Sequence, residues 1–121
     1  MRTILLVDDE PLIRWAVRAG LEAEGYRVIE AGTAREAEDI LAASVPGTIA
    51  VAVLDLKLPD SDDLTLLRRV RSEAPDCRVI IMTAYGSPAL LAEALKAGAV
   101  GTVAKPFDLP RVVQMIRQAA A

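Results

Sequence analysis

The stretch Ile49–Leu54, IAVAVL, consists entirely of apolar residues and is followed directly by the carboxylate of Asp55. It is one of five short apolar runs, rich in Val and Ile, of which three are almost continuously apolar. Such runs are typical of parallel strands that are covered on both faces. The five predicted strands are Thr3–Val7, Arg27–Ala31, Ile49–Leu54, Arg78–Met82 and Val100–Ala104.

Segments with the apolar spacing of helices follow each of these runs. Two of them begin with capping residues, because Thr33 stands three residues before Glu36 and Ser87 directly precedes Pro88. The first predicted helix begins near Leu12 and stops at Gly25. The other four span about 33–43, 62–72, 87–97 and 108–121. This alternation and the crossover rule predict an α/β fold with a doubly wound five-stranded parallel sheet and five helices.

Length, charge and composition limit the possible functions. A chain of 121 residues is expected to form one domain, residues 1–121, and its lone Cys77 forbids an intrachain disulfide. We find neither a membrane-length apolar run nor a secretory signal, so we expect a cytoplasmic protein that does not enter the membrane. The net charge of -3 argues against direct binding of nucleic acid, and the absence of histidine excludes Ser–His–Asp catalysis.

Polar residues follow four of the predicted strands, at the edge where doubly wound sheets bind their ligands. We expect three carboxylates, one hydroxyl and one ammonium to converge there, whereas the second strand, ending in Glu30-Ala31-Gly32, is expected to contribute little. The converging residues are Asp8, Asp9 and Glu10 after the first strand, Asp55 after the third, Thr83 and Ala84 after the fourth, and Lys105 after the fifth.

The chemistry of these groups favours a hard cation. Mg²⁺ binds oxygen ligands and typically takes one or two carboxylates, whereas Zn²⁺ or Cu²⁺ has no histidine here and only a distant cysteine. A carboxylate beside Mg²⁺, an ammonium and a hydroxyl can also perform phosphoryl transfer, with the carboxylate becoming an aspartyl phosphate.

With these residues the chain resembles the receiver domain of bacterial two-component response regulators, over essentially its full length. The resemblance rests on LLVDDE (5–10), VLDLKLPD (53–60), VIIMTAYGS (79–87) and AKPF (104–107). The stretches IRWAV (13–17) and IIMTAYGS (80–87) are most similar to the nitrogen-regulatory class, whose regulators drive sigma-54 transcription. The resemblance implies a flavodoxin-like sheet with strand order 2-1-3-4-5.

The resemblance also implies a phosphoacceptor and a metal site. Asp55 would accept the phosphoryl group and contribute to Mg²⁺ binding. Asp9 would bind Mg²⁺ directly, Asp8 largely through water, and Lys57 through its backbone carbonyl.

Further residues would contact the phosphoryl group in this family. Thr83 would be the switch hydroxyl, and the Ala84 backbone N–H and the Lys105 ammonium would bind phosphoryl oxygens. Pro106, after Lys105, typically follows a cis peptide bond in receivers.

Two positions depart from the family pattern. Thr102 replaces the switch aromatic that usually lies three residues before the lysine, and Tyr85 does not occupy the equivalent place. Asp63 replaces a glycine, in the acidic loop 59–63, and would tolerate a positive φ better than most residues. Phosphorylation is therefore expected, while the usual output route is in question.

As a receiver, the chain would accept its phosphoryl group from a sensor histidine kinase and act on an output domain, a partner protein or a second copy. The segment 87–97 carries few charges, and Leu90, Leu91 and Leu95 cannot all face inward. We therefore expect it to form, with Val100–Ala104 and the last helix, the face that phosphorylation changes. Receivers catalyse only their own phosphorylation and slow dephosphorylation, so we do not expect an enzyme.

Other interpretations of these residues are open. Asp8 and Asp9 could merely cap the first helix, and Lys105 could pair with Asp55 for structure alone. Trp15 is expected at the edge of the first helix, whose inward side we predict to hold Leu12, Ile13, Ala16, Val17 and Gly20. It is either a partly covered surface residue or part of a partner-binding surface.

Alternative functions include a flavodoxin-type cofactor binder, a receiver that no longer carries phosphate, and an Asp-based phosphohydrolase. The loop after the first strand is acidic and only 3% of residues are aromatic, which disfavours a flavin binder. Asp55-Leu56-Lys57 lacks the second carboxylate of the phosphohydrolases.

Overall fold

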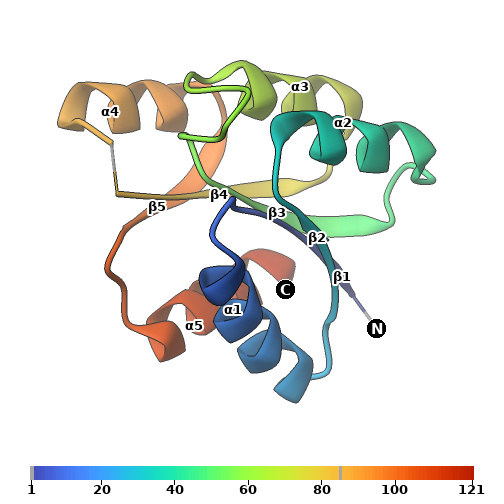
Figure 1. Ribbon diagram of the computed structural model, residues 1–121. Coiled ribbons are helices and arrows are strands. Elements are labelled where there is room, and N and C mark those ends of the chain that lie inside the picture. The colour runs from blue at the N-terminus through green and yellow to red at the C-terminus, as the bar shows by residue number, and fades with distance from the viewer. Residues whose placement is uncertain (1, 85) are drawn as a thin grey trace.

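The computed structural model describes residues 2–84 and 86–121, which leaves Tyr85 outside the described residues. Five parallel strands form a single sheet in the order β2-β1-β3-β4-β5 (Figure 1). This order confirms the predicted doubly wound, flavodoxin-like topology, and each strand end differs from its predicted position by at most one residue. The strands are β1 (Thr3–Val7), β2 (Arg27–Ala31), β3 (Ile49–Leu54), β4 (Arg78–Thr83) and β5 (Ala99–Ala104).

Helices cover both faces of the sheet, so the core has two parts. α1 (Pro11–Ala23) and α5 (Leu109–Ala120) lie on one face, and α2 (Ala34–Ala43), α3 (Thr65–Glu73) and α4 (Pro88–Lys96) lie on the other (Figure 1). Successive side chains of a strand point to opposite faces, and β3 accordingly gives Val53 to the core under α1 and α5 and Leu54 to the other. Among the described residues, no helix is long and apolar enough to cross a membrane.

The capping residues that the sequence identifies start two of the helices. The Thr33 hydroxyl accepts a hydrogen bond from the Glu36 backbone N–H at 3.0 Å, at the start of α2. The Ser87 hydroxyl accepts one from the Leu90 N–H at 3.1 Å, at the start of α4. Both bonds satisfy backbone donors that the first turn of a helix leaves without a partner.

The third helix begins at Thr65, three residues later than predicted. The loop first turns back on itself through paired backbone hydrogen bonds between Leu58 and Ser61. Asp63 then accepts a hydrogen bond from the Thr65 N–H at 2.9 Å, and no described residue other than glycine has a positive φ. Asp63 thus replaces the family's glycine without left-handed backbone, because its side chain fixes the turn into α3.

The first helix corrects the prediction that Leu12 faces inward. Val17 and Leu21, four residues apart, are the buried residues of α1, and they define the stripe that packs on the sheet. Leu12 lies off this stripe because it stands five residues before Val17, and it is 82% exposed. Trp15 is also largely exposed, at 71%, so α1 carries two large apolar side chains on its surface.

Candidate functional site

The ends of three central strands carry the buried polar residues of the described chain: Asp8, Asp55 and Thr83. Backbone hydrogen bonds continue one residue beyond the strands, from Asp8 N to Ala31 O at 3.0 Å and from Asp55 N to Val7 O at 2.9 Å. These bonds hold both carboxylates at the same edge of the sheet, as the sequence predicts.

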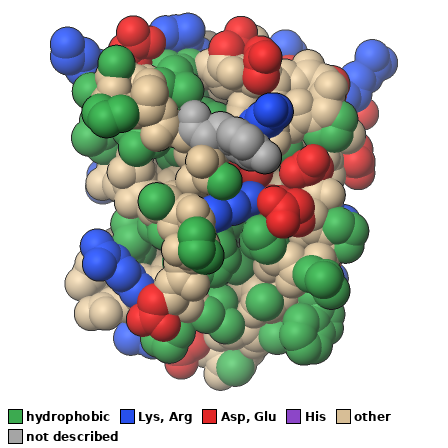
Figure 2. Space-filling model, turned by 60° about the vertical axis from the view of Figure 1, so that its left-hand side comes forward, with side chains coloured by type: hydrophobic (Ala, Val, Ile, Leu, Met, Phe, Trp, Pro, Cys, Tyr) green, Lys and Arg blue, Asp and Glu red, His purple; other side chains and the backbone are tan. Residues whose placement is uncertain are grey.

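Lys105 brings a positive charge between the two buried carboxylates. Its Nζ lies 2.6 Å from Asp8 Oδ2 and 2.8 Å from Asp55 Oδ2, and Glu10 Oε1 is 3.3 Å away. Only 7% of the Lys105 side chain is exposed. In Figure 2 a basic side chain lies beside acidic ones near the middle of the face that the view shows. Lys105 therefore offsets part of the negative charge that β1 and β3 deliver.

Burial changes the ionisation of both partners in the Asp8–Lys105 pair. Loss of solvent raises the pKa of Asp8 above its ordinary value, and contacts with Lys105 and the Glu10 N–H only partly oppose this. Loss of solvent alone would lower the pKa of Lys105, but its bonds to Asp55 and Asp8 outweigh that effect and raise it. The pair therefore favours the charged form of Lys105, whereas burial disfavours the charged form of Asp8.

The carboxylates also fit a divalent cation. Oxygens of Asp8, Asp9 and Asp55 all lie within 4.8 Å of one another. Asp8 Oδ2 is buried, and the contact that the structure shows for it is the ion pair with the Lys105 ammonium at 2.6 Å. Three carboxylates face one ammonium, and an oxygen-only donor set suits a hard cation such as Mg²⁺. Asp9 is exposed and gives a cation access from solvent.

Hydrogen bonds orient both oxygens of Asp55. Oδ1 accepts from the Lys57 backbone N–H at 3.0 Å, while Oδ2 accepts from Lys105 at 2.8 Å. The carbonyl of Lys57 belongs to the loop that this bond fixes beside Asp55. Its role as a metal ligand stays a prediction.

Thr83, Ala84 and Lys105 lie on adjoining strand ends. Thr83 is buried and accepts the Lys105 N–H at its backbone carbonyl, at 3.1 Å, while Ala84 is exposed. The Lys105–Pro106 peptide bond is cis, as the family resemblance implies. Thr83 and Ala84, at the end of β4, therefore adjoin the end of β5 that carries Lys105, the ammonium partner of Asp55.

The end of β2 is part of the site, contrary to the expectation that it contributes little. Arg14 donates a hydrogen bond from Nη1 to the Asp8 carbonyl at 2.5 Å and one from Nε to Glu30 Oε1 at 3.2 Å. Periodicity gave no sign of this contact, because Arg14 and Glu30 are 16 residues apart and meet only through the pairing of β1 with β2.

Asp60 is a second residue that the sequence interpretation did not identify. Its two carboxylate oxygens accept hydrogen bonds from the N–H groups of Ala34, at 2.8 Å, and Arg35, at 3.0 Å. These bonds lower the pKa of Asp60 and tie the loop after β3 to the start of α2. The contact joins residues more than 20 positions apart in the sequence, so no local pattern predicts it.

Comparisons with known proteins agree with this site. A family model described as the response regulator receiver domain matches residues 4–117. The chain is 34% identical to the sporulation initiation phosphotransferase F of Bacillus subtilis, over 95% of this chain and 90% of that protein. It is 32% identical to the C4-dicarboxylate transport transcriptional regulatory protein DctD of Rhizobium meliloti, but covers only 25% of it. It is 36% identical to the transcriptional regulatory protein PhoP of Escherichia coli and covers 48% of it.

Solved structures give the same result. A CheY-like receiver domain protein from Methanospirillum hungatei has a TM-score of 0.92 at 30% identity, with 99% of this chain and 94% of that chain covered. The beryllofluoride-activated NtrC4 receiver domain dimer has a TM-score of 0.86 at 37% identity, with 98% and 96% covered. Fold, site and sequence thus agree over nearly the whole chain.

Proposed function

The chain belongs to the response regulator receiver domain family, the phosphorylation-activated signalling switches of two-component systems, and we propose that Asp55 is its phosphoacceptor. The observation that carries this proposal is the placement of the Lys105 ammonium between two buried carboxylates, Asp8 and Asp55. A buried carboxylate with a fixed cation beside it is arranged to receive a group that brings further negative charge.

Asp55 would act as the nucleophile. One of its carboxylate oxygens attacks the phosphorus of the donor, a new O–P bond forms, and the bond from phosphorus to the donor breaks. The Lys105 ammonium, the Thr83 hydroxyl and the Ala84 N–H would bind the phosphoryl oxygens, since all three lie at the ends of the strands beside Asp55. The product is an aspartyl phosphate.

Asp8, Asp9 and Asp55, together with the Lys57 carbonyl, would hold Mg²⁺. When bound, the cation neutralises charge that the carboxylates and the incoming phosphoryl group share. The geometry that supports this assignment is the grouping of oxygens of Asp8, Asp9 and Asp55 within 4.8 Å of one another, where a single ammonium, that of Lys105, contacts Asp8 and Asp55.

The test is the intact mass of the protein after incubation with acetyl phosphate, with and without Mg²⁺. Wild type should gain one phosphoryl group only with Mg²⁺, and Asp55→Asn should gain none. The matched control is Asp39→Asn, which makes the same change at an exposed residue of α2 and should behave as wild type. Incorporation by Asp55→Asn, or none by wild type that binds Mg²⁺, would contradict the proposal. The second outcome would favour a receiver that no longer carries phosphate.

The exposed side of α1 is a surface for the phosphodonor partner. Leu12 and Trp15 are 82% and 71% exposed and lie three residues apart on one helix face, close to the loop that carries Asp9. Large apolar side chains that gather on a surface often mark a contact site. Hydrophobic side chains are also frequent in the lower part of Figure 2, where α1 and α5 lie. We therefore assign this face to the sensor histidine kinase.

A comparison of donors tests that assignment. Trp15→Ala should slow phosphotransfer from a histidine kinase that phosphorylates wild type, by about 10-fold or more, as truncation of a central interface tryptophan does. It should leave the rate with acetyl phosphate unchanged, because Trp15 does not touch Asp55. Leu95→Ala on α4 is the control and should keep both rates. Equal rates for Trp15→Ala and wild type with the kinase would remove α1 from the interface.

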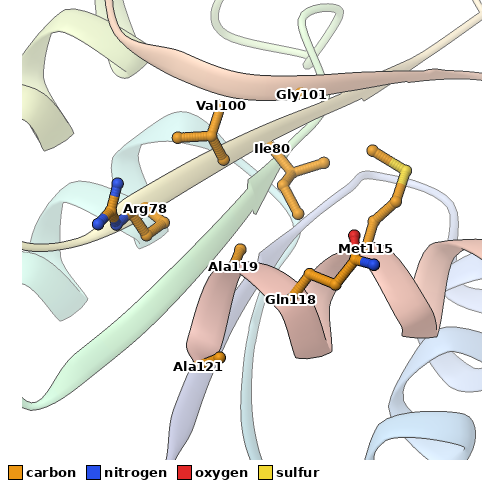
Figure 3. Close-up of a pocket in the computed structure, with 8 residues that line it drawn as sticks. All are labelled: Arg78, Ile80, Val100, Gly101, Met115, Gln118, Ala119 and Ala121. Atoms are coloured by element: carbon orange, nitrogen blue, oxygen red, sulfur yellow. The ribbon is translucent and has the colours of Figure 1, made fainter.

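The output face is proposed to comprise α4, β5 and α5. Leu95 on α4 and Val100 on β5 are about half exposed, so this side also presents apolar surface. A cavity of about 340 Å³ lies between β5 and the end of α5, where Figure 3 shows Val100 and Gly101 facing Met115 and Ala119. Thr102, where receivers usually have an aromatic, is partly buried in β5 opposite Ile81.

Hydrogen exchange with and without beryllofluoride tests this face. Binding of the phosphoryl analogue should change exchange in α4 and β5 and leave α2 unchanged. No change in α4 and β5 would contradict the assignment and point to another output route. Sedimentation of the same two samples tests whether a second copy binds here, as the NtrC4 receiver dimer suggests.

The wider role of the chain follows from its relatives. Transcriptional regulators such as DctD and PhoP match about equally well, so we propose that the switch regulates transcription and favour the nitrogen-regulatory class on the motifs at 13–17 and 80–87.

We also propose that it converts no external metabolite and is not an enzyme in that sense. A screen for hydrolysis of small phosphate esters should therefore be negative.

A further inference from the structure

Arg14, on the first turns of α1, connects Asp8 after β1 with Glu30 near the end of β2. Its Nη1 donates to the Asp8 carbonyl at 2.5 Å, and its Nε donates to Glu30 Oε1 at the end of β2, at 3.2 Å. Its side chain is 21% exposed, so most of its surface is covered. Arg14 touches no carboxylate of the proposed metal site directly.

The Asp8 main chain is held from both sides. Its N–H donates to Ala31 O at 3.0 Å, its carbonyl accepts from Arg14, and its side-chain Oδ1 accepts from the Glu10 N–H at 2.8 Å. The Asp8 carbonyl belongs to the peptide group that leads into Asp9. Because a peptide group is planar, fixing its oxygen also fixes the direction in which the chain enters Asp9.

Two residues, Glu30 in β2 and Gly32 directly after this strand, keep Arg14 in place. The Glu30 carboxylate binds Arg14 through Oε1 and Arg18 through Oε2, the latter at 2.6 Å from Arg18 Nη1. Gly32 leaves the space that the guanidinium uses, since a Cβ on Gly32 would stand 3.2 Å from Arg14 Nη1. A rigid planar donor oriented by a carboxylate is well suited to hold one carbonyl in one direction.

We propose that Arg14, oriented by Glu30, is a positioning residue that presents Asp8 and Asp9 to the divalent cation. This inference rests on the proposed Mg²⁺ site. Residues that orient metal ligands without touching the metal commonly set its affinity. Simple electrostatics predicts the opposite result, because removing a positive charge near a cation site should strengthen cation binding. The sign of the change therefore separates positioning from charge.

The experiment measures the Mg²⁺ dissociation constant of the full chain by isothermal titration calorimetry. Arg14→Met, which keeps an unbranched apolar stem but removes the guanidinium, should weaken Mg²⁺ binding by about 10-fold. Arg18→Met is the matched control, because Arg18 carries the same charge on the same helix and also binds Glu30, but its other ion pair is with Glu22 and not with Asp8. It should bind Mg²⁺ as wild type does, or slightly more tightly.

The outcomes are distinguishable from failure of the proposed function. If wild type binds no Mg²⁺, the metal site itself is wrong. If wild type binds Mg²⁺ and folded Arg14→Met binds it equally well or better, the positioning role is overturned. Circular dichroism checks folding of each variant. Should Arg14→Met not fold, Arg14→Lys replaces it: this variant keeps the charge without the planar fork, and weakening by at least about 3-fold supports the inference, whereas unchanged affinity overturns it.

Discussion

Asp8 and Asp60 lie on loops at the same edge of the sheet, yet their surroundings act on them in opposite directions. Asp8 is fully buried, and loss of solvent raises its pKa. Asp60 is exposed, and hydrogen bonds from the Ala34 and Arg35 N–H groups lower its pKa. The folded state therefore disfavours the charge of Asp8 and favours the charge of Asp60.

This difference separates a functional carboxylate from a structural one. A buried carboxylate whose charged form is disfavoured is a candidate for a functional site, and at Asp8 a bound divalent cation would offset that cost. Asp60 needs no such explanation, because its bonds to the start of α2 stabilise the fold directly.

Removal of the Lys105 charge should have the largest effect. Lys105→Met leaves Asp8 and Asp55 buried without their ammonium, so the free energy of unfolding at pH 7 in EDTA should fall by about 3 kcal/mol. Urea unfolding followed by circular dichroism measures it. Lys96→Met, at the exposed end of α4, is the control and should change stability little. An equal stability for Lys105→Met and wild type would mean that the ion pairs only offset the cost of burial.

Neutralising Asp8 should act in the other direction. Asp8→Asn removes a charge that burial disfavours, so in EDTA the variant should be more stable than wild type. Mg²⁺ should raise the melting temperature of wild type by mass action but not that of Asp8→Asn.

Asp9→Asn provides the comparison for Asp8→Asn. Asp9 is exposed, so its substitution should gain less stability in EDTA while also losing the response to Mg²⁺. A lower stability of Asp8→Asn in EDTA would show that its pair with Lys105 outweighs the cost of burying it.

The sequence predicted the sheet and the converging carboxylates because both depend on local order. An apolar strand such as Ile49–Leu54 carries its own signal, and in a parallel sheet the next residue, Asp55, must lie at the carboxyl edge. Lys105 could be placed beside it for the same reason. No distance was needed for these steps.

The contacts that the sequence did not predict are those that depend on side-chain direction. Arg14 reaches the Asp8 carbonyl only because β2 brings Glu30 next to α1, and neither residue differs in pattern from an ordinary exposed charge. The prediction that Leu12 faces the core rests on its apolar character. The sequence does not fix which side of the helix faces the sheet, and in the structure Val17 and Leu21 define that side. The start of α3 was misplaced since Asp63 fixes a turn rather than opening a helix.

The smallest effect is expected at Asp60. Asp60→Ala removes the acceptor for the Ala34 and Arg35 N–H groups, and the loss of an exposed helix cap of this kind costs about 1 kcal/mol or less. Because the folded pKa of Asp60 lies below its ordinary value of 3.8, this stabilisation is complete well above pH 3.8 and is lost as the pH falls through the folded pKa. Urea unfolding at pH 7 and at successively lower pH should therefore show wild type and Asp60→Ala converging in acid. Asp62→Ala, its exposed neighbour, should match wild type throughout. A difference between wild type and Asp60→Ala that persists unchanged in acid would mean that the side chain stabilises the loop by packing and not through its charge.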